Sequence, residues 1–210
     1  NAYSLIHDDM PDMDNDELRR WSPTVWKKYS ESDAILAWDL LNTLSFELLS
    51  DISDSSAALM LIKLLSSSIW FYGMLWGQVE DLYFEKNDKE LTLDLLKNLH
   101  SKKTWALIKA SILWWVSLSE NMEHFDNYSK YADNIGLAFQ IKDDLLDEEG
   151  SKEETGKSVW WETKWYVHFL WLDDSKKELN KLIKESLDLI SPLNSEKLNF
   201  LTKYIWERKK

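Results

Sequence analysis

The stretch SESDAILAWDLLNTLSFELLS, residues 30–50, decides the fold class. Ser30 or Ser32 can cap a helix here, and Glu31 and Asp33 fall in its first turn, where the helix dipole favours acids. Beyond them the apolar residues repeat at intervals of three and four, the period of an amphipathic helix: Ile35, Leu36, Leu40, Leu41, Leu44 and Leu48. The stretch therefore predicts one long helix.

The same period recurs along most of the chain. It runs through residues 57–84, 91–99, 106–118, 128–146, 179–190 and 198–205. No segment alternates apolar and polar residues between turn signals, as a strand would. The connections are short and polar, which suits antiparallel neighbours. The sequence thus predicts an all-α protein, an antiparallel helical bundle that forms a single domain over residues 1–210.

Composition excludes several classes of protein. The 210 residues are 44% hydrophobic, ample for a core, and no run of 18 apolar residues predicts a membrane span. A net charge of −12 argues against nucleic acid and anionic membrane surfaces as partners. The absence of cysteine excludes disulfides, thiolate metal sites and cysteine nucleophiles.

An acidic cluster, HDDMPDMDNDELRR, occupies residues 7–20. Asp8 and Asp12 lie four residues apart, on one helix face, and Asp14 follows where Pro11 disturbs the helix. Carboxylates this dense repel one another unless cations neutralise them, and Mg²⁺ shared with substrate phosphates is the natural partner. The arginines that follow suit phosphate binding.

A second acidic cluster, FQIKDDLLD, spans residues 139–147. Asp143 and Asp147 share a helix face, so two such faces opposed across a bundle could hold metal ions and, through them, a diphosphate. Taken alone, either cluster could be an ordinary solvated helix face. Neither has the central glycine and terminal glutamate of an EF-hand.

The two clusters together resemble the aspartate-rich motifs of the trans-isoprenyl diphosphate synthases. The spacing of Asp8, Asp9 and Asp14 around Pro11 is similar to that of bacterial farnesyl and related geranylgeranyl diphosphate synthases. Further matches cover essentially the whole chain: 23–25, 34–37, 77–78, 81–82, 103–104, 155–157 and 204–210.

The resemblance implies a fold, a reaction and a set of roles. It implies the isoprenoid synthase helical bundle, a cytoplasmic homodimer, and the Mg²⁺-assisted condensation of an allylic diphosphate with isopentenyl diphosphate. About three Mg²⁺ ions are expected, with Mn²⁺ as a substitute. The metal ligands by resemblance are Asp8, Asp9, Asp14, Asp143, Asp144 and Asp147. The residues expected to bind substrate are Arg19, Lys103, Thr104, Gln140 and Lys157 for the allylic diphosphate and Arg20 for isopentenyl diphosphate, with Lys103 also expected to take part in catalysis.

Product length in this family depends on residues one helical turn before the first aspartates. Tyr3 and Ser4 occupy that turn here. An aromatic residue at this depth favours a short product, so we expect C15 farnesyl diphosphate, with C20 geranylgeranyl diphosphate as the alternative.

The chain departs from the family pattern in two respects. The family domain normally begins several helices earlier, with a Gly-Lys-x-Arg element that binds isopentenyl diphosphate, so we expect an N-terminally truncated domain. The second departure is compositional: the chain has 13 tryptophans and five glycines, where usage of about 7% would give roughly 15 glycines. Six tryptophans stand where the family has glycine: Trp21, Trp38, Trp76, Trp105, Trp160 and Trp171. We hypothesise that their codon is UGA, read as glycine in the source organism.

Two alternatives remain. A non-catalytic paralogue, acting as a regulatory subunit of a complete synthase, gains weight if the tryptophans and the missing N-terminus are real. A terpene cyclase on the same bundle fits less well, because the second cluster is Asp143-Asp144-x-x-Asp147 rather than a mixed Asn/Ser/Glu triad.

Overall fold

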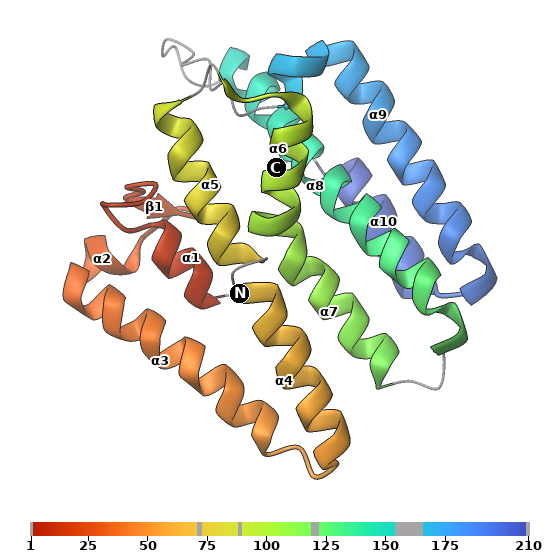
Figure 1. Cartoon of the computed structure of the whole chain (residues 1–210). Helices are drawn as coiled ribbons and strands as arrows, with labels where there is room; N and C mark the ends of the chain where they lie inside the picture. The colour runs from red at the N-terminus through yellow and green to blue at the C-terminus, as the bar shows by residue number, and fades with distance from the viewer. Residues whose placement is uncertain (1, 71–72, 88–89, 119–121, 154–165, 209–210) are drawn as a thin grey trace. The chain divides into compact units, whose positions relative to one another are not determined.

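The computed structural model describes residues 2–70, 73–87, 90–118, 122–153 and 166–208, which are almost entirely helical (Figure 1). This confirms the all-α prediction. The chain divides into two compact units, residues 1–63 and 64–210.

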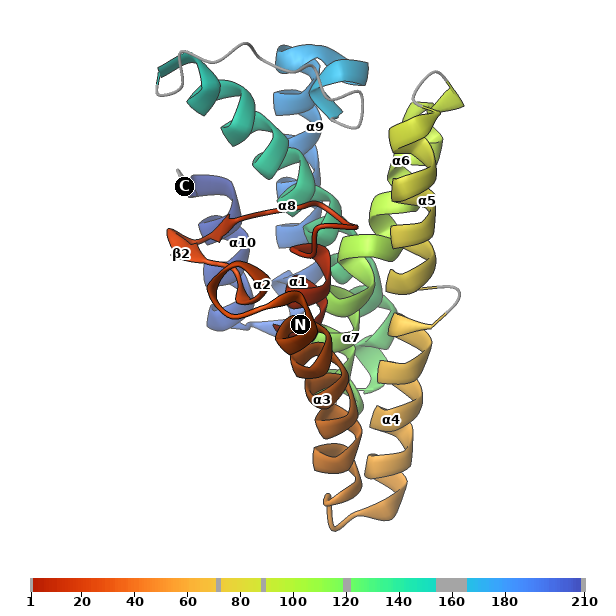
Figure 2. The same ribbon diagram turned by 90° about the vertical axis from the view of Figure 1, so that its left-hand side faces the viewer.

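The first unit holds the helix predicted from residues 30–50. It begins with α1 (Ala2–Asp8), a short hairpin of β1 (Leu18–Arg19) and β2 (Ser22–Pro23), and α2 (Val25–Lys28). The predicted helix is α3 (Glu31–Ser50), whose N-cap is Ser30: its hydroxyl accepts a hydrogen bond from the Asp33 N–H at 3.0 Å. Both α1 and α2 pack against α3 (Figure 2). The two-residue strands were not predicted, because each is too short to show alternation.

Helix α4 (Ser55–Ile69) begins in the first unit and ends in the second. The periodic segment 57–84 was predicted as one element, but the described residues form α4 and a separate helix, α5 (Met74–Lys86). Gly73 lies at the start of α5, where a Cβ would clash with the Ser68 carbonyl oxygen. Only glycine permits this close approach of the two backbones.

The second unit continues through α6 (Leu93–His100), a π-helical turn η2 (Ser101–Trp105), α7 (Ala106–Ser117) and the 3₁₀ turn η3 (Met122–His124). The long helices α8 (Phe125–Glu153) and α9 (Tyr166–Ile190) follow, then the 3₁₀ turn η4 (Ser191–Leu193) and α10 (Glu196–Glu207). Helices α8 and α9 form the main packing pair, and α7 and α10 pack on α8 (Figure 1).

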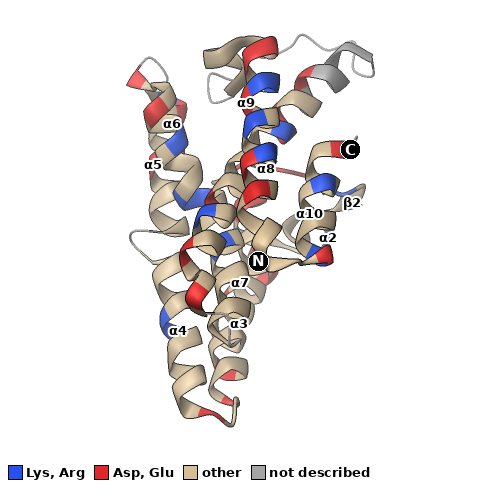
Figure 3. Ribbon diagram, turned by 90° about the vertical axis from the view of Figure 1, so that its right-hand side faces the viewer, with Lys and Arg blue, Asp and Glu red and all other residues tan. Residues whose placement is uncertain are grey.

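The core of the second unit is built on one face of α8. Its buried residues recur at helical spacing: Tyr131, Ile135, Ala138, Ile141 and Leu145. They meet Leu179, Leu182 and Ile190 of α9 and Leu96 and Leu99 of α6. Charged residues of both signs recur along α9 (Figure 3). The predicted amphipathic period therefore corresponds to a real buried stripe.

One apolar part of the chain bears on the prediction that no segment spans a membrane. By length and composition, the stretch Ser55–Lys86, which contains α4 and α5, is apolar enough to cross a membrane, with a mean hydropathy of 1.5 over an 18-residue window of which 38% is buried. The prediction rested on uninterrupted apolar runs. The serines of α4 interrupt such a run, but they leave the mean hydropathy of the window high. Core helices of soluble proteins meet the same criterion, so this stretch is weak support for a membrane span.

Candidate active site

The first aspartate motif lies at the end of α1. The Asp9 N–H donates to the Leu5 carbonyl as the last helical bond, and Pro11 then turns the chain away from the helix axis. The Asp14 N–H donates to the Asp8 carbonyl at 2.9 Å, which brings the third aspartate of the motif back beside the first. The two extra residues around Pro11 thus form a turn that gathers Asp8, Asp9 and Asp14.

The three aspartates of this motif have different surroundings. Asp9 is only 3% exposed, and its Oδ1 accepts a hydrogen bond from Arg19 Nε at 2.6 Å, with Arg19 Nη2 at 2.5 Å. This hydrogen bond raises the pKa of the Arg19 guanidinium, which therefore stays charged. Asp8 is half-buried and Asp14 exposed. The hairpin places Arg19 on Asp9, while Arg20 lies exposed at the hairpin tip.

Tyr3 and Ser4, the predicted chain-length residues, are both buried one turn before the aspartates. Burial raises the pKa of the Tyr3 phenol to about 12, and its hydroxyl has no hydrogen-bond partner among the described residues. His7 stacks on Trp38 with ring centroids 4.3 Å apart, and burial lowers the pKa of its imidazole.

The second motif lies on α8, where adjacent aspartates face different partners. Asp144 is 3% exposed; its Oδ2 accepts a hydrogen bond from the Tyr166 N–H at 2.7 Å and its Oδ1 one from Gln140 Nε2 at 3.0 Å. Asp143 is more accessible and forms an ion pair with Arg208. Asp147 continues the helix, but its side chain lies outside the described residues. Gln140, predicted to bind substrate, supports Asp144 in this structure.

Lys103 and Thr104 lie in the π-helical turn η2. Such turns are rare and are frequent at functional sites. Lys103 Nζ lies 2.5 Å from Asp81 Oδ2, so α5 holds the lysine in place. Gly77 allows this contact, because a Cβ there would clash with the Lys103 backbone nitrogen. Thr104 is inside the turn and does not cap a helix.

Sequence reasoning missed several residues of these arrangements. It assigned no role to Arg208 or to the Tyr166 N–H, and it noted Asp81 without predicting its ion pair with Lys103. Each of these residues is 22 or more positions in the sequence from the residue that it contacts, so only the tertiary structure brings the two together. Lys157 and the 155–157 match lie outside the described residues. The first motif belongs to the first unit and the second motif to the second, and their opposition across a bundle stays a prediction.

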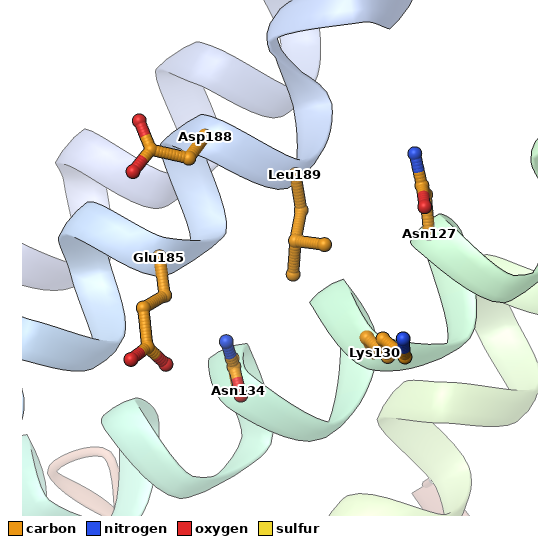
Figure 4. A pocket seen from close by; sticks show the side chains of 6 residues that line it. All are labelled: Asn127, Lys130, Asn134, Glu185, Asp188 and Leu189. Carbon is orange, nitrogen blue, oxygen red and sulfur yellow. The ribbon is translucent and has the colours of Figure 1, made fainter.

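A groove between α8 and α9 lies apart from the second motif (Figure 4). It is lined by Asn127, Lys130, Asn134, Glu185, Asp188 and Leu189, none of which was predicted to be functional. It lies in the N-terminal half of α8, whereas Asp143 and Asp144 lie in the C-terminal half. This groove has no link to the predicted chemistry.

Comparison with known proteins decides the family. Residues 1–164 match the polyprenyl synthetase family model. The chain belongs to the polyprenyl synthetase family. It is 40% identical over 218 residues to a farnesyl diphosphate synthase of Micrococcus luteus, covering 100% of this chain and 74% of that protein. It is 37% identical over 198 residues to a geranylgeranyl diphosphate synthase of Cyanophora paradoxa, covering 90% of this chain and 66% of that protein.

Solved structures agree with this assignment. A geranyltransferase of Helicobacter pylori, complexed with magnesium and isoprenyl diphosphate, superimposes with a TM-score of 0.83 at 38% identity, over 98% of this chain and 71% of that one. The predictions of the isoprenoid synthase fold and of a short-chain trans-prenyl diphosphate synthase are confirmed.

Proposed function

We propose that this polyprenyl synthetase condenses dimethylallyl or geranyl diphosphate with isopentenyl diphosphate, and that its main product is farnesyl diphosphate. The allylic C–O bond breaks, the isopentenyl double bond attacks the allylic cation, and the released diphosphate takes the proton that is lost. The turn that gathers Asp8, Asp9 and Asp14 beside Arg19 carries the proposal, because it puts carboxylates and a guanidinium at one point.

The side chains present fit a divalent metal. All the predicted ligands are carboxylates, the hard oxygen donors that Mg²⁺ prefers, and Asp8, Asp14 and Asp143 are at least partly accessible. When bound, Mg²⁺ would draw off the negative charge that the diphosphate develops in the transition state. We propose that about three ions bind, that Mn²⁺ can replace them, and that Asp9, Asp144 and Asp147 complete the ligand set.

The cations of the chain would bind the substrate phosphates. Arg19 and Lys103 are each held by a carboxylate, so both charges are positioned before substrate arrives. We assign the allylic diphosphate to Arg19, Lys103, Thr104, Gln140 and Lys157, and isopentenyl diphosphate to Arg20. The buried Tyr3 and Ser4 would close the hydrocarbon pocket below Asp8.

We also propose that both units belong to one prenyl synthase domain and that this domain is a cytoplasmic homodimer. The family model spans the boundary between the units, which supports the single domain. Leucines four residues apart remain exposed along α3: Leu36, Leu40, Leu44 and Leu48. The stripe is apolar, and α3 carries no basic residue. The same stripe on a second copy of the chain can therefore pack against it across a two-fold axis.

Turnover with labelled isopentenyl diphosphate tests the function. The full-length protein should release diphosphate and form a C15 product only with Mg²⁺ or Mn²⁺ present, and Asp8→Ala and Asp143→Ala should each lower kcat by at least about 100-fold. Asp133→Asn, which removes an α8 carboxylate paired with Lys109, should not. Turnover that survives both alanine variants would overturn the metal mechanism. Failure of the unaltered protein to turn over would favour the regulatory subunit, and a C20 product would favour the geranylgeranyl alternative.

A further inference from the structure

Arg208 supplies the second aspartate motif with a cation from the chain itself. Its guanidinium forms an ion pair with Asp143 and lies 4.5 Å above the centre of the Phe139 ring. Phe139 and Asp143 are four residues apart on one face of α8, so a single arginine covers both. The Arg208 side chain is only 14% exposed in this position.

The backbone of Arg208 is held in place by α10. The Arg208 N–H donates to the Tyr204 carbonyl, at the end of that helix. Helix α10 is tied to α8 by the Tyr131 and Thr202 hydroxyls, 3.0 Å apart, and to α9 by Trp206 Nε1, which donates to Asn180 Oδ1. The packing of α10 therefore fixes the backbone from which the Arg208 side chain reaches Asp143.

The two adjacent aspartates have different partners. Asp144 accepts hydrogen bonds from the Tyr166 N–H and the Gln140 amide. Asp143 has the Arg208 guanidinium as its charged partner. Because carboxylates close together repel, the ionised motif is more stable with a positive charge beside it.

We propose that Arg208 is the resident counter-cation of the second aspartate motif: it neutralises Asp143 in the metal-free protein, and a divalent cation must displace it to use that carboxylate. This proposal rests on the proposed function only in taking Asp143 as a metal ligand. It makes Arg208 a positioning residue that sets metal affinity.

Mn²⁺ binding without substrate, followed by electron paramagnetic resonance, tests this proposal separately from turnover. Arg208→Gln should bind Mn²⁺ about fivefold more tightly than the unaltered protein and should melt at lower temperature in EDTA, with the difference shrinking at saturating Mn²⁺. Lys203→Gln removes the same charge from an exposed position on α10 and serves as the control.

Equal Mn²⁺ affinity in Arg208→Gln and Lys203→Gln would overturn the proposal. If Arg208→Gln does not fold, Arg208→Lys is the second variant. It keeps the positive charge but loses the planar guanidinium, so its gain in Mn²⁺ affinity over the unaltered protein should be smaller than fivefold. In an Asp143→Asn background the Arg208 effect should vanish. An inactive protein that still shows these Mn²⁺ shifts would contradict the proposed function and leave the role of Arg208 intact.

A second inference comes from the backbone at two tryptophans. Trp21 is the second residue of the two-residue loop between β1 and β2, and Arg20 and Trp21 have φ of 51° and 66°. Consecutive positive φ angles in such a loop define a type I′ turn, which strongly favours glycine at its second position. The Trp21 side chain is 90% exposed, so its burial contributes little to offset the strain.

Trp171 has an even more restricted conformation. It interrupts α9 with φ 61° and ψ 161°, a region that is occupied almost only by glycine. Its indole is 75% exposed. A third tryptophan, Trp105, is buried against Gly136, and its Nε1 has no hydrogen-bond partner among the described residues.

We infer that the protein made in its own cells carries glycine at positions 21 and 171, because the codon there is read as glycine. The same codon would then give glycine at positions 38, 76, 105 and 160, which accounts for the shortage of glycine and the excess of tryptophan. Residue 105 follows Thr104 directly, so this change would also open space beside the predicted diphosphate-binding turn.

Mass spectrometry of the protein from its own source tests the inference. The tryptic peptide 21–27 contains both Trp21 and Trp26, so it should show glycine at position 21 and tryptophan at position 26. Tryptophan at both positions would overturn the inference.

Thermal unfolding of the recombinant chain gives an independent measurement. Trp21→Gly and Trp171→Gly should each raise Tm by about 2–4 °C through relief of strain. Trp26→Gly should lower it, since Trp26 Nε1 donates to the Asp16 carbonyl at 2.9 Å. A lower Tm in both glycine variants would contradict the conformational argument.

Discussion

The backbone N–H of Tyr166, the first residue of α9, donates a 2.7 Å hydrogen bond to the buried Asp144 carboxylate of α8. One aspartate of the second motif therefore fixes the start of the next helix. The Tyr166 side chain is also buried, and desolvation, together with the nearby Asp144 charge, raises the pKa of its phenol. We therefore predict that the Asp144 carboxylate serves both the proposed metal chemistry and the stability of the fold.

Replacing Asp144 should cost stability as well as activity. Asp144→Ala leaves the Tyr166 N–H and the Gln140 amide without their acceptor, and we expect a loss of about 1–3 kcal/mol in the free energy of unfolding. Urea denaturation measures it. Asp133→Ala is the matched control, because Asp133 is a half-exposed carboxylate of α8 whose partner is Lys109; equal losses in both variants would contradict the role assigned to Asp144.

Arg19 should matter for the same reason in the first unit. Arg19→Gln leaves the Asp9 carboxylate buried without its charged partner, so we expect a loss of about 1–3 kcal/mol in unfolding free energy and a higher KM for the allylic diphosphate. Arg20→Gln, at the exposed hairpin tip, should leave stability within about 0.5 kcal/mol. A stable Arg19→Gln protein would show that Asp9 finds another donor.

Gly77 should be intolerant of any side chain. Gly77→Ala would drive a Cβ into the Lys103 backbone nitrogen, so α5 and η2 must separate, at about 1–3 kcal/mol. Turnover should fall because Lys103 moves. Val79→Ala, on an exposed part of α5, controls for the loss of helix packing. Unchanged turnover in Gly77→Ala would show that the reaction does not depend on the position of Lys103.

Tyr3 should set product length. Tyr3→Ala removes a buried ring one turn below Asp8, and we expect chromatography to show C20 or longer products beside or in place of C15. Tyr3→Phe keeps the ring and should keep the product. An unchanged product in Tyr3→Ala would place the pocket floor elsewhere.

Tyr3 should also contribute to stability at alkaline pH. Burial raises the pKa of its phenol from 10.0 to about 12, so the folded state binds more protons than the unfolded state between these values. This contribution is fully present below pH 10 and is lost as pH rises through 12. Tyr3→Phe should therefore weaken the fall in Tm over this range, whereas Tyr29→Phe, at an exposed site, should not.

Much of the fold could be predicted because helical period is local. The stretch 30–50 predicted α3 closely, and the period in 128–146 identified the buried face of α8. The breaks were harder to predict. The segment 57–84 is continuous in period, yet it contains the close approach at Gly73, which depends on backbone geometry rather than on hydrophobicity.

The sequence by itself determined that the protein is all-α, that it belongs to the polyprenyl synthetase family, and which acidic residues form its two motifs. The helical class follows from residue type and spacing along the chain, and the family and its motifs from the resemblance of these residues to a known pattern. Only the tertiary structure decided which aspartate of each pair is buried. Adjacent residues on a helix differ by about 100° in direction, so Asp143 and Asp144 cannot share one environment. Their partners, Arg208 and the Tyr166 N–H, come from distant parts of the chain, which no local pattern reveals.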